Sequence, residues 1–285
     1  MSNTKQNGKV AFITGGNRGL GLETARELGK QGIVVVLGSR DSKKGAAAAA
    51  ELRDEGVTAE SLGFDVNKSQ DHQKAYDYFE KKYGRLDILV NNAGVWKESD
   101  TSSPSSVPKP ASAVSPEILR ETFETNFFAT VALTQKLLPL IRKAPAGRIV
   151  NVSSILGSLT LHADPASPIY AFKVFAYNAS KTALNAFTVH LAHELRDSKV
   201  KVNSAHPGWV KTEMDAADQA GGGYVDEDII NQVPMGRFAR PGDIAAAVAF
   251  LADPERSGFI NGAALPVDGG WSSDSSWQSL RLRKR

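Results

Sequence analysis

The chain has 285 residues, of which 41% are hydrophobic and 23% charged, and its 34 basic and 31 acidic side chains leave a net charge of only +3. This composition is ordinary for a globular protein and gives no reason to expect a nucleic-acid partner. Cysteine is absent, which excludes disulfides, thiolate nucleophiles and cysteine-ligated zinc.

Short apolar runs alternate with longer helical patterns along the chain. This alternation is typical of parallel strands joined by helical crossovers. Strands are expected at Val10–Thr14, Ile33–Leu37, Ala59–Phe64, Leu86–Val90, Arg148–Val152, Val200–Ala205 and Ala263–Val267. Because no linker separates two such sets, the pattern predicts an α/β fold with one doubly wound domain over residues 1–285. We expect a parallel seven-stranded sheet, the Rossmann fold, with flexible tails at 1–7 and 272–285.

A glycine-rich turn follows the first predicted strand and opens a helical pattern. Glycines at this place let the backbone turn sharply and approach a pyrophosphate, whose charge is met by amides at the helix N-terminus. The turn is therefore predicted to bind a dinucleotide through Gly15, Asn17, Arg18, Gly19, Leu20 and Gly21.

The second strand is followed by Ser39-Arg40-Asp41, where enzymes that use NAD usually carry a carboxylate for the ribose. Ser39 and Arg40 suit the 2′-phosphate of NADP, and Arg18 in the glycine turn adds a second cation. We therefore expect NADP(H) as the cofactor in preference to NAD(H). The alternative is that both arginines are solvated surface residues. If the segment after this strand is displaced by one residue from the expected position, the negative charge of Asp41 lies near the ribose.

Two long segments without periodicity interrupt the alternation. Glu98–Ser115 is rich in serine and proline and follows a strand end, so it is predicted to be a surface loop that acts as a substrate lid. Thr212–Pro234 contains three consecutive glycines and is predicted to form a second mobile flap.

A helical pattern near the middle of the chain places a lysine on its inward face. Positions 181, 184, 188, 191 and 195 follow Tyr177 at helical steps, so Tyr177 and Lys181 lie on the stripe that faces the core. An inward lysine is costly unless a polar group receives it. The functional interpretation is that the ammonium lowers the pKa of the Tyr177 phenol, so that its hydroxyl exchanges a proton near neutral pH. The alternative is a buried tyrosine beside a lysine that reaches the surface.

The order of these motifs resembles that of the short-chain dehydrogenases/reductases, in their compact one-domain branch. The resemblance covers roughly Gly8 to Gly270. Besides the glycine turn and the pair of Tyr177 and Lys181, it rests on Asp65-Val66, Asn91-Asn92-Ala93-Gly94, Asn126, Ser153-Ser154 and Pro207-Gly208.

The resemblance implies a catalytic set and the rest of a cofactor site. Ser154 would hydrogen-bond the substrate oxygen, and Tyr177 would act as the general acid in reduction. Lys181 would bind the nicotinamide ribose and tune Tyr177, while Asn126 would hold a water that links Lys181 to solvent. Cofactor contacts are implied at Asp65, Val66, Asn92, Ala93, Gly94, Tyr177, Lys181, Pro207, Gly208, Val210 and Thr212. The implied activity is hydride transfer between NADP(H) and an aldehyde or ketone, or the reverse on an alcohol.

One feature departs from the family pattern. Ser154 and Tyr177 are 23 residues apart, whereas about a dozen is common, and the extra stretch includes Leu161–Pro168 beside the expected active site. This spacing, the glycine turn and Ser39-Arg40-Asp41 resemble the NADPH-dependent carbonyl reductases. The C-terminal run Ala263–Gly270 resembles the tetrameric bacterial members instead, so the oligomeric state is left open between monomer, dimer and tetramer.

The histidines give no metal site. His190 and His193 are three apart and Glu194 follows, but the zincin pattern would require a histidine at position 197, which is Asp197. His162, in the extra stretch, is expected to be an exposed loop residue.

The expected partner is a small-molecule carbonyl or alcohol substrate, with no nucleic acid and no membrane. An apolar signal is absent from the N-terminal residues and the longest apolar run is too short to cross a bilayer, so a cytoplasmic enzyme is expected. A redox-silent NADP(H)-binding sensor is the main alternative, although a sensor has no need of an acid. A nucleotide-sugar epimerase would normally need a larger sugar-binding domain.

Overall fold

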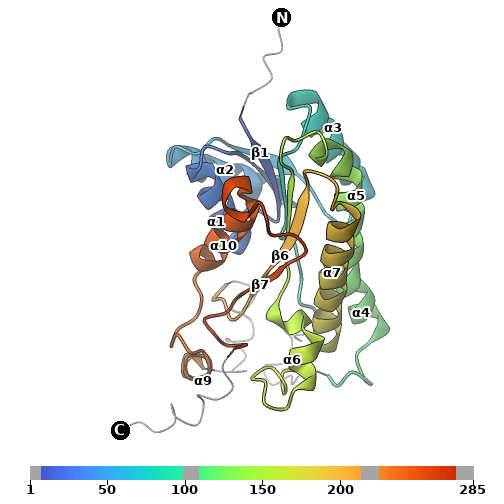
Figure 1. The fold of residues 1–285 in the computed structure, drawn as a ribbon, viewed down its shortest axis with the longest axis vertical. Helices are drawn as coiled ribbons and strands as arrows, with labels where there is room; N and C mark the ends of the chain where they lie inside the picture. Colours follow the sequence, from blue (N-terminus) through green and yellow to red (C-terminus); the bar gives the residue numbers. More distant parts are fainter. Residues whose placement is uncertain (1–7, 99–108, 213–224, 274–285) are drawn as a thin grey trace, which may run out of the picture.

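The computed structural model describes residues 8–98, 109–212 and 225–273, and a seven-stranded parallel sheet forms its centre (Figure 1). The strand order is β3-β2-β1-β4-β5-β6-β7. The strands are β1 (Val10–Thr14), β2 (Val34–Ser39), β3 (Ala59–Gly63), β4 (Ile88–Asn91), β5 (Arg148–Val152), β6 (Lys201–Pro207) and β7 (Ala264–Val267). The predicted Rossmann fold is confirmed, and each predicted strand occurs with ends that differ by at most two residues.

Helices cover both faces of the sheet (Figure 1). On one face α1 (Gly19–Lys30), α2 (Ser42–Asp54) and α10 (Pro241–Ala252) share a core with Ala11 and Ile13 of β1. On the other face α3 (Ser69–Lys82), α5 (Ala129–Ile141) and α7 (Phe175–Glu194) pack on Val10 and Phe12. Adjacent residues of β1 thus point to opposite faces and all are buried, which explains why the strand is apolar without alternation.

Shorter elements lie in the connections. They are α4 (Pro116–Phe123), the π-helical turn η1 (Glu124–Phe128), the 3-10 turn η2 (Ile155–Gly157), α6 (Leu159–Ala163), α9 (Asp226–Gln232) and α11 (Pro254–Ser257). In the part of the chain that the structure describes, no helix is both long and apolar enough to cross a bilayer.

The strand order reverses direction at β1. From β1 the chain builds outward to β2 and β3 on one side, and then returns to place β4 on the other side. Beyond the carboxyl ends of β1 and β4 such a reversal leaves a crevice, because the two flanking connections diverge to opposite faces.

The two predicted mobile segments are only partly described. Residues 99–108 of the expected lid and 213–224 of the expected flap lie outside the described residues. Within the expected flap, Asp226–Gln232 forms helix α9, which the sequence analysis missed. Acidic side chains in its first turn, with the Asp228 carboxylate accepting from Val225 N at 3.0 Å, favour a helix start there.

The tails and the extra stretch also differ from expectation. Residues 1–7 and 274–285 lie outside the described part, whereas Ser272 and Ser273 complete a turn through hydrogen bonds to Asp268 and Gly270. The extra stretch contains helix α6, and its His162 is half-buried, with Nε2 3.0 Å from the carbonyl of Leu156. The expectation of an exposed loop histidine is therefore wrong.

Candidate active site

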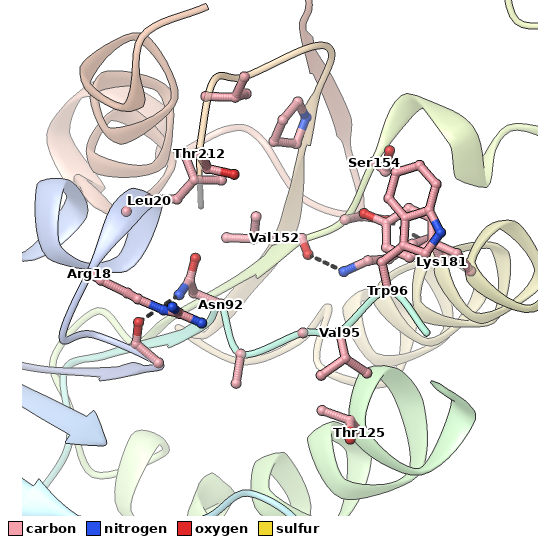
Figure 2. Close-up of a pocket in the computed structure, with 18 of the residues that line it drawn as sticks. Arg18, Leu20, Asn92, Val95, Trp96, Thr125, Val152, Ser154, Lys181 and Thr212 are labelled. Carbon is pink, nitrogen blue, oxygen red and sulfur yellow. Dashed lines mark hydrogen bonds between the residues drawn. The ribbon is translucent and has the colours of Figure 1, made fainter. Parts of the chain in front are cut away.

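One pocket runs along the carboxyl edge of the sheet, from Arg18 at one end to Ser154 and Lys181 at the other (Figure 2). Most of the residues predicted to form the site line it. These are Gly15, Asn17, Arg18, Gly19, Leu20, Arg40, Asp65, Val66, Asn92, Ala93, Gly94, Ser154, Tyr177, Lys181, Pro207, Gly208, Val210 and Thr212. Gly21, Ser39 and Asn126 are predicted site residues that do not line the pocket.

The glycine turn is tied to the end of β4 by side chains from both segments, because the Thr14 hydroxyl accepts from the amides of Asn92 and Ala93, each at 3.0 Å. Asn92 Nδ2 donates to the carbonyls of Thr14 at 2.9 Å and Gly15 at 3.2 Å. Gly15 has a φ of +63°, which favours glycine. Gly21 lies behind the turn, where an added Cβ would be 2.4 Å from the Gly15 carbonyl oxygen. Gly21 thus allows helix α1 to approach the turn closely, and it has no contact with the pocket itself.

The N-terminus of α1 is open to an anion. No side-chain hydrogen bond from a described residue caps this helix, and its first turn contains no acidic residue. The first amides of a helix have no partner within it and carry partial positive charge. A Cβ added at Gly19 would meet nothing within 4 Å among the described atoms, so there is space in front of these amides. The turn therefore fits a pyrophosphate.

The residues after β2 leave a cation facing the pocket. Arg40 is exposed and lines it. Asp41 instead caps α2, with Oδ1 accepting from Lys43 N at 2.9 Å and Lys44 N at 3.1 Å, and it does not line the pocket. Ser39 is buried and its hydroxyl donates to the Asp41 carbonyl at 2.8 Å. The side chain of Ser39 is thus used inside the fold, contrary to its predicted contact with the phosphate.

The predicted adenine contacts lie on the loop after β3. Asp65 N donates to the Asp71 carboxylate at 2.9 Å, and the carbonyl of Val66 lies 2.6 Å from His72 Nε2. Asp71 and His72 of helix α3 therefore anchor this loop, and Asp65 and Val66 line the pocket.

Helix α7 begins with a carboxylate from a distant part of the chain. Glu98, after β4, is buried, and its two oxygens accept from Ala176 N at 3.0 Å and Tyr177 N at 2.8 Å. A carboxylate satisfies these amides and interacts favourably with the positive end of the helix. The sequence analysis missed this residue, because nothing local links it to a helix that starts 77 residues later.

Lys181 is buried beside Tyr177. Its Nζ donates to the Val152 carbonyl at 2.9 Å and lies 5.7 Å from the centroid of the Tyr177 ring. Burial lowers the pKa of Lys181 to about 8. An added Cβ at Gly94 would be 3.6 Å from this Nζ, so Gly94 keeps the floor of the pocket open next to the ammonium.

The expected lowering of the Tyr177 pKa is not found. Burial raises the pKa of Tyr177 to about 12, and the hydrogen bond with the Ser154 side chain only partly offsets this. Desolvation of a phenolate thus dominates over the neighbouring cation in the protein alone. The phenol is protonated at neutral pH, as a proton donor must be.

The two adjacent serines have different partners. Ser153 Oγ donates to Asn185 Oδ1 at 2.5 Å, which fastens the end of β5 to α7. Ser154 Oγ accepts from Leu156 N at 3.1 Å and so starts the turn η2, while its side chain also bonds Tyr177. Both serines line the pocket, and Ser154 is the one of the two whose side chain bonds the phenol.

Asn126 lies behind the pocket in the π-helical turn η1. Its Nδ2 donates to the Val95 carbonyl at 2.9 Å and to Ser180 Oγ at 3.0 Å, and its Oδ1 accepts from Val95 N at 2.8 Å. Both amide hydrogens are thus in use, so Asn126 can hold the predicted water only as an acceptor.

Other ionisable side chains near the site have structural partners. His206 is buried against Ser204 Oγ at 2.8 Å, and burial lowers its pKa to about 4, so it is neutral and lies outside the pocket lining. Within the described ranges, no cluster of three or more potential metal ligands occurs.

Besides Phe64 at the end of the third predicted strand, four aromatic side chains that the sequence analysis did not single out line the pocket. They are Trp96, Phe172, Trp209 and Trp271. They come from segments that are far apart in the chain and share no motif, so only the fold brings them together.

The chain matches known proteins over most of its length. Residues 9–221 match the family model described as short chain dehydrogenase. Curated relatives include cyclopentanol dehydrogenase of Comamonas sp., 34% identical over 94% of this chain and 98% of the relative. Another is the 3-oxoacyl-acyl-carrier-protein reductase of Pseudomonas aeruginosa, 30% identical over 92% and 97%.

Solved structures have the same architecture. An actinorhodin polyketide ketoreductase with NADPH superposes with a TM-score of 0.79 at 29% identity, covering 94% of this chain and 98% of its own. A gluconate 5-dehydrogenase of Burkholderia cenocepacia, in complex with NADP and tartrate, gives 0.80 at 29%, with 95% and 97% covered.

Proposed function

Since this chain belongs to the short-chain dehydrogenase/reductase family, whose members act on alcohol or carbonyl substrates with NAD(P)(H), we propose that it is an NADPH-dependent carbonyl reductase. One observation carries the proposal. The pocket that begins at the uncapped N-terminus of α1 ends at Ser154, Tyr177 and Lys181. A dinucleotide bound along this pocket would place its nicotinamide ring at the end that holds these three residues. No other part of the described lining holds a phenol or an ammonium that could donate a proton.

We infer that NADPH is the preferred cofactor, because charge favours it. Arg40 lines the pocket where the 2′-phosphate would lie, and the carboxylate of Asp41 is engaged by the amides of α2. A cation attracts the phosphate, and the carboxylate of the neighbouring Asp41 is already paired with hydrogen-bond donors. Two similar proteins of known structure hold NADPH or NADP, which supports the same choice.

In the proposed reaction the reduced nicotinamide supplies a hydride to the carbonyl carbon. Ser154 donates a hydrogen bond to the substrate oxygen and orients it. Tyr177 transfers its phenolic proton to the same oxygen, which becomes the hydroxyl of the alcohol. Its raised pKa keeps it protonated until negative charge develops on the oxygen, and an alkoxide is a far stronger base than a phenolate.

Lys181 is proposed to stabilise the phenolate that remains after transfer. Its ammonium is held near the phenol ring by the Val152 carbonyl, and its pKa of about 8 leaves it charged at neutral pH. Because phenolate and ammonium then lie in a buried site, their attraction is weakly screened. Glu98 positions the pair by capping the helix from which both project.

The test is an assay of NADPH oxidation with aldehydes, ketones and diketones, with identification of the alcohol formed. We expect turnover with NADPH at a kcat/KM well above that with NADH, and loss of about a hundredfold or more in kcat in Ser154→Ala. Tight NADPH binding without turnover of any carbonyl compound would refute the reductase and favour a redox-silent sensor.

A further inference from the structure

The four aromatic side chains Trp96, Phe172, Trp209 and Trp271, here termed the aromatic arc, continue directly from the proposed acid. Trp96 stacks on Tyr177 with ring centroids 5.4 Å apart and an interplanar angle of 24°. Along the arc, the ring centroids of Trp96 and Phe172 are 6.1 Å apart and those of Phe172 and Trp209 are 5.4 Å apart. The centroids of Trp209 and Trp271 are 5.6 Å apart. All four line the pocket, and Figure 2 places Trp96 beside Lys181 and Ser154, away from Arg18. The arc therefore forms a wall where the substrate must lie.

The backbone holds this wall in place. Trp271 N donates to the Asp268 carbonyl at 3.2 Å, and the Trp209 carbonyl accepts from Ala239 N at 2.9 Å. Trp271 is buried and packs with Ile155 and Leu156 of the turn that follows Ser154. A wall with these supports is formed before a ligand arrives, so its shape selects among ligands instead of adapting to each.

Charge is confined to other parts of the pocket. Among the described residues that line it, the charged ones are Arg18, Arg40 and Asp65 in the proposed cofactor part, and Lys181 under the phenol. The arc contributes no charge of its own. A carboxylate or phosphate on the substrate would lose water beside the arc without gaining a cation from it, which is strongly unfavourable.

Two indole donors of the arc are buried without a described acceptor. Neither Trp96 Nε1 nor Trp271 Nε1 has a hydrogen-bond partner among the described residues. A tryptophan that only fills a core usually has its N–H paired, and a buried unpaired donor is costly. Packing of the core alone therefore does not account for these two tryptophans.

We propose that the substrate is a neutral, flat cyclic ketone, of fused-ring or aryl type, which stacks against the aromatic arc while its carbonyl oxygen meets Ser154 and Tyr177. This assignment rests on the proposed function, of which it specifies the substrate class. The carbonyl carbon gains a hydride from NADPH and the oxygen gains the proton of Tyr177, so the products are a secondary alcohol and NADP+. A ring system matches the arc because flat faces bury most area against aromatic walls and gain stacking energy.

The test compares three ketones at saturating NADPH: β-tetralone, cyclohexanone and a carboxylate-bearing analogue of β-tetralone. We expect kcat/KM for β-tetralone to exceed that for each of the others by about tenfold or more, since the second ring adds buried apolar area and stacking. The preference for β-tetralone over cyclohexanone should fall about tenfold in Trp271→Leu. Phe259→Leu, which removes an aromatic ring that is fully exposed, is the matched control and should leave the preference unchanged.

The outcomes separate the two proposals. Reduction of cyclohexanone at the same or higher kcat/KM as β-tetralone would overturn the substrate class and leave the reductase intact. Equal losses on both ketones in Trp271→Leu would mean that the tryptophan only supports the fold, which also overturns the assignment. Reduction of none of the three ketones would overturn the substrate class, and the reductase itself is refuted when the aldehydes and diketones also give no turnover with NADPH bound. If Trp271→Leu does not fold, Trp96→Leu removes the other end of the arc and applies the same criterion.

Discussion

The cofactor end and the substrate end of the pocket are formed by different kinds of chemical group. The cofactor end is formed by backbone amides, glycines and short polar side chains from consecutive motifs, and the side chains of Asn92 and Thr14 link the glycine turn to the end of β4. At the substrate end, large side chains from four separate segments form the aromatic arc. A cofactor that many related enzymes share needs a constant backbone geometry, whereas a particular substrate needs a particular wall. The first can be recognised from motifs, and the second cannot.

The largest effect that sharpens this comparison is expected at Arg40. Arg40→Asp replaces a cation with a carboxylate next to the position of the 2′-phosphate, so kcat/KM for NADPH should fall about a hundredfold while that for NADH changes far less. Measuring kcat/KM for both cofactors gives the answer. An unchanged ratio would mean that Arg40 is a solvated surface residue.

The pH dependence of kcat for ketone reduction tests the substrate end of the pocket. Lys181 has a pKa of about 8, so its ammonium is charged below that pH and becomes neutral above it. If the charge stabilises the Tyr177 phenolate, kcat should fall by about tenfold for each pH unit once the pH exceeds 8. A kcat that stays flat from pH 7 to 10 would remove Lys181 from the proton chemistry. NADPH should be saturating at every pH, because Lys181 also lies where the cofactor is proposed to bind.

Glu98 connects the two ends of the pocket, because it lies in the loop after β4 and caps α7, the helix that carries Tyr177 and Lys181. Glu98→Gln keeps the size of the side chain but removes one acceptor and the charge at the N-terminus of α7. We expect kcat to fall about fivefold through small misplacement of the phenol, with the Kd of NADPH unchanged.

Glu121→Gln is the matched control for this variant. Glu121 is an exposed carboxylate that pairs with Lys97 on the surface, so its loss should leave kcat unchanged. An equal kcat for wild type and Glu98→Gln would show that the cap only supports the fold.

The smallest effect is expected at Asp41. Asp41→Ala removes the cap of α2 and should lower the free energy of unfolding by about 1 kcal/mol, measured by denaturant titration. The preference for NADPH should not change, because the carboxylate does not line the pocket. A large shift in cofactor preference would instead place its charge near the ribose.

The fold was predictable because strands and helices differ in period, and the β1 strand, its glycine turn and the inward stripe of α7 are all local patterns. The expected burial of Lys181, for example, follows from spacing alone and agrees with its position in α7. Strand ends were less certain because register, such as the pairing of Ser39 with Gly63, extends a strand beyond its apolar run.

The remaining features depend on contacts between distant residues or on competition between energies. Glu98 reaches α7 across 78 positions. The Asp41 carboxylate is engaged as the cap of α2, and the buried Ser39 hydroxyl donates to the Asp41 carbonyl. The direction of the Tyr177 pKa was predicted wrongly, because spacing indicates the nearby ammonium but not the depth of burial, which dominates. For His162, the turn after Ser154 supplies the carbonyl that holds it, and sequence gives no sign of that partner.

Single-turnover oxidation of bound NADPH by a reducible ketone in Tyr177→Phe tests directly whether Tyr177 is the proton donor. The variant keeps the ring that stacks on Trp96 and removes only the proton donor. We expect NADPH to bind with nearly the wild-type Kd while the rate constant of turnover falls by about a thousandfold or more. A rate within a few-fold of the wild type, with alcohol as the product, would contradict the assignment of Tyr177 as the acid.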